Sequence, residues 1–218
     1  MIKNLLLLSL FILTAAFTTA QEGTKIKIST EFGDMIAVLY DDTPLHKENF
    51  LKNIKNGTYD GALFHRVIHG FMAQGGDPNS IGSEITEVLG NDDCPTIKNE
   101  ISYKHIHKKG ALSAARLPDG SNPEKESSGC QFFIVQGYIH NDAQLDAMEN
   151  EKYRFPDVNR AIYKIRGGTP ALDMQYTVFG EVIEGLDIID MIHAMPTGYY
   201  KVKDRPNTDV KFTITILK

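Results

Sequence analysis

The stretch FHRVIHGFMAQGGDP, residues Phe64–Pro78, combines groups that are seldom found so close together. It sets one arginine, two histidines and one glutamine among large apolar side chains, and it ends in Gly-Gly-Asp-Pro. It contains no serine, threonine, cysteine or lysine that could attack a substrate. These residues are compatible with a metal site, with a phosphate-binding loop, or with a strand that carries polar groups beside an apolar pocket.

The apolar pattern of the stretch predicts a strand up to Gly70, and a strand alternates its side chains between two faces. One face would then carry Phe64, Arg66 and Ile68, and the other His65, Val67 and His69. Gly75 and Gly76 would let the backbone turn sharply after the strand. The arginine is therefore expected on one face together with apolar neighbours.

Three kinds of chemistry are poorly supported by these residues. His65 and His69 have helical spacing for metal ligands, but the glutamate of a zinc-protease motif and a nearby cysteine are absent. The Gly-Gly-Asp-Pro end lacks the spacing and the Lys-Ser or Lys-Thr pair of a phosphate loop. No G-x-S-x-G motif occurs, and nothing adjacent to Cys130 marks it as a reactive thiolate. There remains an apolar pocket with one permanent cation, which suits a reaction without proton abstraction or a covalent intermediate.

The first twenty residues, MIKNLLLLSLFILTAAFTTA, have the pattern of a secretory signal peptide. Lys3 supplies a positive start, an apolar run follows, and small residues precede Gln21. A membrane anchor is the alternative, but the apolar run is short for a helix that spans a bilayer. We therefore expect residues 1–20 to be removed, and residues 21–218 to form an exported protein, periplasmic or secreted, that does not stay in the membrane.

Composition limits the partners and the redox chemistry. The chain has 218 residues, a formal net charge of −5 and no basic block, which argues against a nucleic-acid partner. Its two cysteines, Cys94 and Cys130, are too few to frame a small disulfide-rich domain. They could pair in an exported protein, but their spacing does not show it. Free thiols are the default expectation, and a disulfide is the alternative.

The rest of the chain predicts short strands and two core helices. Thr43 is the expected N-cap of the first helix, with Pro44 at its first position. Residues 77–100 lack a pattern and predict a long loop, which in ordered proteins is often functional. This order lacks the alternation of strands and helices found in parallel sheets, and it is typical of an all-β barrel. The expected strands lie at 25–30, 35–40, 131–136, 176–182 and 210–217, and the expected helices at 43–57 and 184–195.

One segment, residues 138–169, interrupts this order. It contains NDAQLDAMENEKYR, which has helical character, and a basic half follows. We expect a partly helical insertion that lies solvated on the surface, in preference to a specific docking element.

The opening stretch closely resembles the signature F-H-R-x-I-x-x-F-x-x-Q-G-G-D of the cyclophilin family of peptidyl-prolyl cis–trans isomerases. Three further segments match in the same order: GALSAAR at 110–116, SGCQFFI at 128–134 and YTVFGEVIEGL at 176–186. With the terminal strands, the resemblance covers nearly all of residues 21–218 except the insertion. Four matches in order are a specific signal.

The resemblance implies a closed eight-stranded antiparallel barrel, capped by two helices, with the substrate groove on its outer face. It implies acceleration of X–Pro bond rotation in proline-containing polypeptides, here folding exported proteins. It implies a monomer and no cofactor or metal. An apolar pocket that removes water from the amide, and an arginine that donates a hydrogen bond to it, would supply this catalysis.

The resemblance also implies roles for individual residues. Arg66 matches the catalytic arginine. The expected substrate-binding residues are the pocket walls Phe71, Met72, Phe133 and Leu172, the amides Gln74 and Gln131, the motif histidine His65, the backbone of Ala115, and Tyr176, where many members carry histidine. Arg116 replaces a common asparagine, and this second cation predicts a preference for acidic residues near the proline.

Two other functions remain open from the sequence. A cyclophilin fold could serve as a chaperone or binding module with little turnover, and residues 138–169 would be the natural place for such binding. Retention of the arginine and both glutamines favours the enzyme. A metal-binding protein that uses His65 and His69 is the weakest alternative.

Overall fold

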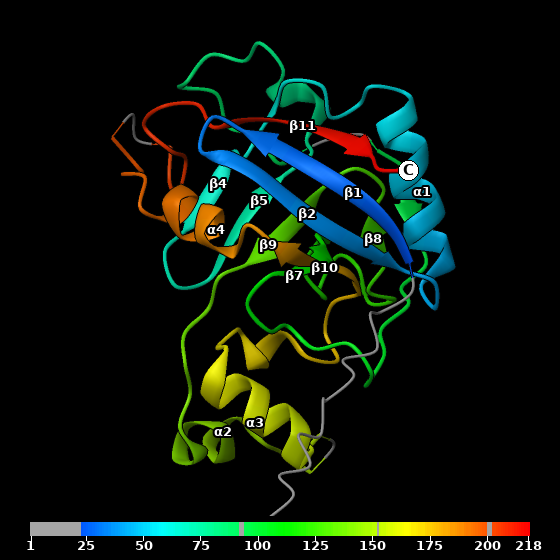
Figure 1. Cartoon of the computed structure of the whole chain (residues 1–218), viewed down its shortest axis with the longest axis vertical. Helices are drawn as coiled ribbons and strands as arrows, with labels where there is room; N and C mark the ends of the chain where they lie inside the picture. The colour runs from blue at the N-terminus through cyan, green and yellow to red at the C-terminus, as the bar shows by residue number, and fades with distance from the viewer. Residues whose placement is uncertain (1–22, 92–93, 152, 200–201) are drawn as a thin grey trace, which may run out of the picture.

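The computed structural model describes residues 23–218 except 92–93, 152 and 200–201, so the expected signal peptide lies outside the described residues. The fold is mainly β, with a strongly curled antiparallel sheet (Figure 1). Its strand order is β3 (Ala62–Leu63), β11 (Lys211–Ile216), β1 (Gly23–Thr30), β2 (Gly33–Tyr40), β10 (Val178–Glu184), β7 (Ala111–Ala114), β9 (Phe132–Val135), β5 (Met72–Gly75) and β4 (Arg66–Ile68).

The two ends of this sheet belong to one stretch of chain, because only Phe64 and His65 separate β3 from β4. The sheet therefore curls until its ends meet. The predicted single strand breaks at Phe64, whose backbone N–H donates to the carbonyl oxygen of Val210 at 2.9 Å. Phe64 consequently points into the barrel core, 4.6 Å from the ring of Phe212, and the prediction that it shares a face with Arg66 is wrong. This break gives nine strands in the described sheet where eight were expected.

The core fills the inside of the curled sheet with alternate residues of each strand. In β1, Ile26 and Ile28 are fully buried, and in β11 Phe212 and Ile214 alternate with exposed neighbours. This period of two is the pattern by which the terminal strands were predicted. The inner face thus forms the hydrophobic core, and the outer face remains available for a site.

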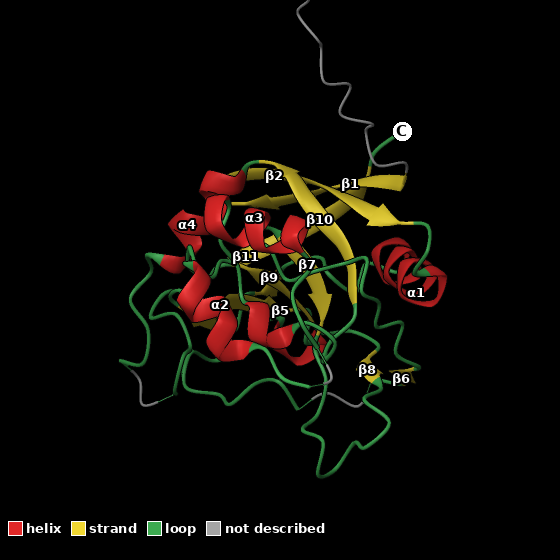
Figure 2. Ribbon diagram, turned by 90° about the horizontal axis from the view of Figure 1, so that it is seen from below, coloured by secondary structure: helices red, strands yellow, loops and turns green. Residues whose placement is uncertain are grey.

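Helices α1 (Pro44–Lys55) and α4 (Leu186–His193) lie at opposite ends of the sheet, as both views show (Figure 2). Thr43 precedes α1 as predicted, but its side chain makes no cap; the hydroxyl donates to the carbonyl oxygen of Tyr40. The carboxylate of Glu100 replaces it and accepts the backbone N–H groups of Leu45 and His46 at 3.1 and 3.0 Å. A loop residue far along the chain thereby satisfies the helix N-terminus.

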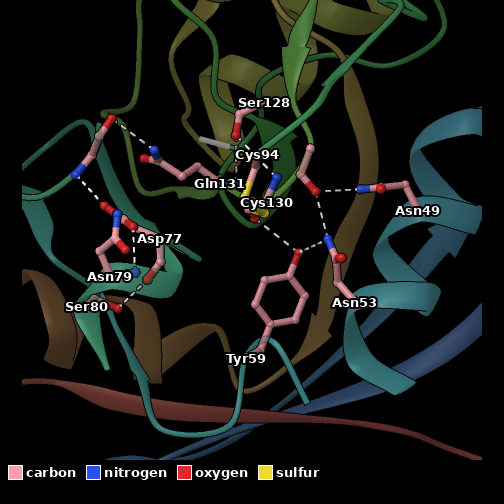
Figure 3. Close-up of a disulfide and its surroundings, with 12 residues drawn as sticks. Asn49, Asn53, Tyr59, Asp77, Asn79, Ser80, Cys94, Ser128, Cys130 and Gln131 are labelled. Carbon is pink, nitrogen blue, oxygen red and sulfur yellow. Dashed lines mark hydrogen bonds between the residues drawn. A yellow bond between two sulfur atoms is a disulfide. The ribbon is translucent and has the colours of Figure 1, made fainter. Parts of the chain in front are cut away.

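The two cysteines form a disulfide, so the default expectation of free thiols is wrong (Figure 3). Cys94 lies in the long loop, and Cys130 lies two residues before the start of β9. Gly76, at φ 92°, passes so close that a β-carbon would lie 2.5 Å from the carbonyl oxygen of Cys130. The loop is tied a second time by a short pair, β6 (Thr96–Ile97) with β8 (Ser127–Ser128), and contains the 3₁₀ turn η1 (Pro78–Ser80).

The insertion contains two helices, α2 (Asp142–Met148) and α3 (Asp157–Ile165), which lie together below the sheet in Figure 1. It is more than the solvated excursion that was expected, because it has a small core of its own. That core consists of Ile106, Leu145, Phe155 and Tyr163. The turn η2 (Pro170–Leu172) then leads back to β10. None of the helices in the described part of the chain has the length and apolarity needed to cross a bilayer.

Candidate functional site

A second apolar cluster lies on the outer face of the sheet, built by the other half of the same alternation. In β9, Phe132 faces the core while Phe133 belongs to the outer cluster. In β5, Ala73 faces the core while Met72 belongs to the outer cluster. The strand period of two thus makes one wall of a pocket from the same strands that form the barrel.

This outer cluster surrounds a cavity of about 200 Å³. Nine of the eleven residues predicted for the site line it: Arg66, Phe71, Met72, Gln74, Ala115, Arg116, Phe133, Leu172 and Tyr176. They come from β4, β5, β9, η2 and the segments after β7 and before β10. Gln131 instead lines an adjoining cavity of about 430 Å³ that shares Gln74, Ala115 and Arg116 with the first. The exception is His65, which lines neither.

Arg66 stands at the edge of the cavity in a row of cross-strand neighbours, opposite Gln74, which in turn is opposite Phe133. Its Nη1 donates to Gln74 Oε1 at 3.3 Å, and its Nε lies 3.5 Å from Asp204 Oδ2. The side chain is 42 % exposed, so the guanidinium retains donors for a bound group. Sequence reasoning missed Asp204, whose only local signal is turn chemistry around KDRPN.

The two glutamines extend a chain of hydrogen bonds from Arg66 to the long loop, and we call this chain the Gln74–Gln131 relay. Gln74 Nε2 donates to Gln131 Oε1 at 2.7 Å, and Gln131 Nε2 donates to the carbonyl oxygen of Gly90 at 3.0 Å. The N–H of Gly90 donates to buried Asp77 at 2.6 Å. Figure 3 shows Gln131 next to the disulfide, which fixes the loop on the other side of this relay. Each amide therefore has a set orientation.

His65 is only 5 % exposed and lines neither of the two cavities. Burial lowers its pKa to about 4, so the ring is neutral at pH 7. The prediction that His65 contacts the substrate directly is therefore not supported by its position. His69 is exposed and its ring lies near Tyr138, so the two histidines do not face one another. No group of metal-ligating side chains occurs among the described residues.

Arg116 lines the cavity, but its charge is already satisfied. Its Nη1 lies 2.7 Å from Asp119, its Nε donates to the carbonyl oxygen of Gln175, and its guanidinium stacks on Tyr176 at 4.5 Å. The hydrogen bond from Arg116 also lowers the pKa of the Asp119 carboxyl. The side chain is 4 % exposed. The predicted preference for acidic residues near the proline is therefore not supported, because the guanidinium is part of the pocket wall and is paired with groups of the protein.

Sequence reasoning also missed a buried pair behind the pocket. The ring of His107 lies parallel to Phe133, with centroids 6.2 Å apart, and its Nδ1 is 2.9 Å from Asp173 Oδ1. The hydroxyl of Tyr163, from α3, donates to Asp173 at 2.8 Å. No motif surrounds these residues in the sequence. The contact connects the insertion to the wall of the cavity through a single carboxylate.

The comparisons with known proteins agree with this geometry. The family model described as cyclophilin type peptidyl-prolyl cis-trans isomerase/CLD matches residues 25–216. A Staphylococcus epidermidis protein, assigned by name to the peptidyl-prolyl cis-trans isomerases, is 37% identical over 187 residues, which are 85% of this chain and 87% of that protein. A Streptococcus pyogenes protein, named as a bifunctional phosphatase and isomerase, is 37% identical over 86% of this chain, but the chain spans only 37% of its length.

Among solved structures, a Cryptosporidium parvum cyclophilin type isomerase superimposes with a TM-score of 0.63 at 23% identity, covering 89% of this chain and 98% of that one. This likeness concerns the fold. The match of the family model extends from β1 to β11 and includes the row that holds Arg66 and Phe133, and the 37% identical relative matches 85% of the chain. The chain therefore belongs to the cyclophilin-type peptidyl-prolyl cis–trans isomerases.

Proposed function

We propose that this isomerase acts on exported polypeptides by seating a proline in the 200 Å³ cavity and donating a hydrogen bond from Arg66 to the twisting amide. The observation that carries the proposal is the position of a half-exposed guanidinium at the rim of an apolar cavity. Phe133 and Leu172 provide apolar walls, and Arg66 provides the cation.

Rotation about an X–Pro peptide bond needs little more than an apolar cavity and a hydrogen-bond donor. A peptide bond resists rotation by about 18–20 kcal/mol, because its C–N bond has partial double-bond character. In the transition state conjugation is lost, and the proline nitrogen becomes a better hydrogen-bond acceptor. An apolar cavity excludes water, so a donor inside it acts more strongly than in bulk solvent. Arg66 keeps its charge at any physiological pH, so no proton needs to be transferred.

The neighbouring groups hold the donor and the substrate in place. Asp204 and Gln74 limit the positions of the guanidinium without occupying all its donors. The Gln74–Gln131 relay presents amide groups between the two adjoining cavities, where a peptide backbone would pass. Positioning of this kind lowers the barrier because the ordering cost is met when the substrate binds.

Export of the chain is supported by two independent features. The first twenty residues have the pattern of a signal peptide, and the Cys94–Cys130 disulfide is of a kind that persists in oxidising compartments. We therefore propose periplasmic or secreted proteins as substrates. Mass spectrometry of the protein recovered from cells is expected to give a chain that starts at Gln21. An intact N-terminus that retains residues 1–20 would oppose export by cleavage.

The decisive experiment compares wild type, Arg66→Ala and Arg154→Ala in NMR exchange measurements on a short X–Pro peptide. Wild type is expected to accelerate cis–trans exchange, and Arg66→Ala to lose about 10²–10³-fold of the turnover, the usual effect of removing one transition-state donor. Arg154 is an exposed arginine of the insertion and serves as the matched control, which should retain activity.

The outcomes separate the alternatives. Equal activity of Arg66→Ala and wild type would leave the family assignment intact and reject Arg66 as the donor. Peptide binding without acceleration by wild type would favour the binding-module alternative.

A further inference from the structure

A further cavity, of about 340 Å³, lies on the far side of one wall of the 200 Å³ cavity proposed to hold proline, which we call the proline cavity. The two cavities share the segment 170–176. Leu172 and Tyr176 line the proline cavity, whereas Ala171 and Met174 line the second one. Adjacent residues of a single segment therefore face two different cavities. We call this further cavity the aromatic cleft. The insertion and the loop before β7 contribute Tyr103, Met148, Tyr153 and Phe155 to it, and the segment after η2 contributes Met174.

The aromatic cleft has the lining of a site for an apolar side chain. The rings of Tyr103 and Tyr153 stack with centroids 5.8 Å apart, and Phe155 meets Tyr153 edge-on at 5.0 Å. Tyr103 is 62 % exposed, and Met148 also reaches the surface. Exposed aromatic and methionine side chains around a hollow are typical of surfaces that accept varied apolar groups.

The carboxylate in the cleft, Asp173, does not alter this character. It is buried and already accepts hydrogen bonds from His107 and from Tyr163 and Tyr153. The other polar side chains of the lining, Asn150 and Gln175, accept hydrogen bonds from the backbone N–H of Tyr153 and from Lys125. The occupant is therefore expected to be apolar.

Met174 has a backbone conformation that is uncommon for a residue other than glycine. Its φ is 61°, in the left-handed region, which is unfavourable for a residue with a β-carbon. Backbone strain of this kind concentrates at functional sites. Here it presents the flexible thioether to the cleft.

We propose that the aromatic cleft is a second substrate subsite, which binds an apolar side chain a few residues from the proline of the same polypeptide. The inference rests on the proposed function, since the proline of that polypeptide occupies the neighbouring cavity. Consecutive Cα atoms lie 3.8 Å apart, so two or three residues of extended chain, about 7–11 Å, reach across one segment of backbone. The insertion would then select sequences in which proline has a large apolar neighbour.

The test uses a host peptide with one proline in an alanine background, and a set in which phenylalanine replaces alanine at each of the four positions on either side. Isomerisation and binding are measured by NMR with wild type, Tyr103→Ala, Met174→Gly and the control Ile165→Ala. Ile165 is 79 % exposed on α3, within the same insertion and outside the cleft. Wild type is expected to prefer phenylalanine at one or two positions by about tenfold in kcat/KM, as apolar pockets usually discriminate.

The two cleft variants should lose most of this phenylalanine-to-alanine ratio, and Ile165→Ala should keep it. Met174→Gly is the sharper of the two, because glycine adopts a positive φ without strain. It is expected to maintain or raise Tm while lowering the ratio, a combination that a purely structural role would not produce.

A wild-type ratio near one at every position, or a ratio that survives in both variants, would overturn the proposal. So would a cleft that holds a second copy of this chain, seen as a sedimentation change in Tyr103→Ala without a change in the ratio. Turnover of the all-alanine peptide by wild type tests the proposed function independently of the aromatic cleft. If that turnover is absent, the ratio of peptide dissociation constants still tests the cleft.

Discussion

Phe64 and Arg66 show how much the surroundings of a residue depend on local backbone geometry. Two residues apart, they would share a face in a regular strand, but the break between β3 and β4 sends Phe64 into the core and leaves Arg66 at the rim of the cavity. His65 sits at the break and is buried with it. The signature histidine is thus a buried side chain of the barrel, and its contribution is expected to be in stability.

That expectation gives a pH prediction. The folded pKa of His65 is about 4 and the ordinary value is 6.5, so between these pH values the unfolded chain binds a proton that the folded chain does not. Stability is therefore lost as pH falls from about 6.5 to about 4, and the pKa difference corresponds to about 3 kcal/mol. Urea unfolding at pH 7 and pH 4 should show a smaller loss for His65→Gln than for wild type.

The exposed His69 supplies the control, since His69→Gln should lose as much stability on acidification as wild type does. Equal losses for wild type and His65→Gln would show that His65 is not the group responsible.

At the scale of elements, the long loop and β9 act together. Cys130 precedes β9 and is bonded to Cys94, while Asn49 of α1 donates to the carbonyl oxygen of the adjacent Gly129 at 2.7 Å (Figure 3). These contacts fix Gln131 and the start of β9, the strand that carries Phe133. A loop without any predicted secondary structure is thereby made rigid enough to support the groove.

Removal of the disulfide should therefore affect both stability and the groove. The bond closes a loop with a sequence separation of 36, for which the entropic model gives about 4 kcal/mol. The double variant Cys94→Ser, Cys130→Ser is expected to lose stability of that order in urea unfolding and to bind an X–Pro peptide more weakly, because Gln131 loses its support. Wild type treated with reductant should show the same two changes. Unchanged peptide affinity in the double variant and in reduced wild type would show that the disulfide does not support the site.

At the scale of the whole molecule, one carboxylate connects three parts. Asp173 lies after η2, accepts from Tyr163 of the insertion, and bonds His107 behind Phe133 of the barrel. The insertion therefore shares a buried polar network with the pocket wall and also supplies the aromatic cleft. Its helices are an extension of the site rather than a separate surface decoration.

Asp173→Ala is expected to destabilise the protein by about 3–5 kcal/mol, because it leaves buried polar partners without an acceptor. Asp142→Ala, which removes an exposed carboxylate of the same insertion, should change the stability much less, because exposed ion pairs contribute little. Urea unfolding of both variants checks the prediction. Similar small losses for the two would mean that the network contributes little to holding the insertion on the barrel.

Much of the fold and site was predictable, and the misses have physical reasons. The strands β1 and β11 and the helices α1 and α4 lie close to the expected residues, because alternation and helix boundaries are local signals. The cavity residues were assigned through motifs that match a known family. The cap from Glu100, the disulfide, Asp204 and the His107–Asp173 pair all join residues distant in sequence, and no local pattern encodes such contacts.

The sequence by itself determined the barrel class, because a period of two predicts which side chains face the core, and its motifs resemble a family whose site residues match those that line the cavity. Only the tertiary structure decided what those side chains do. Arg66 remains available because Asp204 and Gln74 hold it without burying it, whereas Arg116 is neutralised by Asp119 and stacked on Tyr176. The two arginines are the same residue type, and their difference arises from neighbours that the curled sheet brings together.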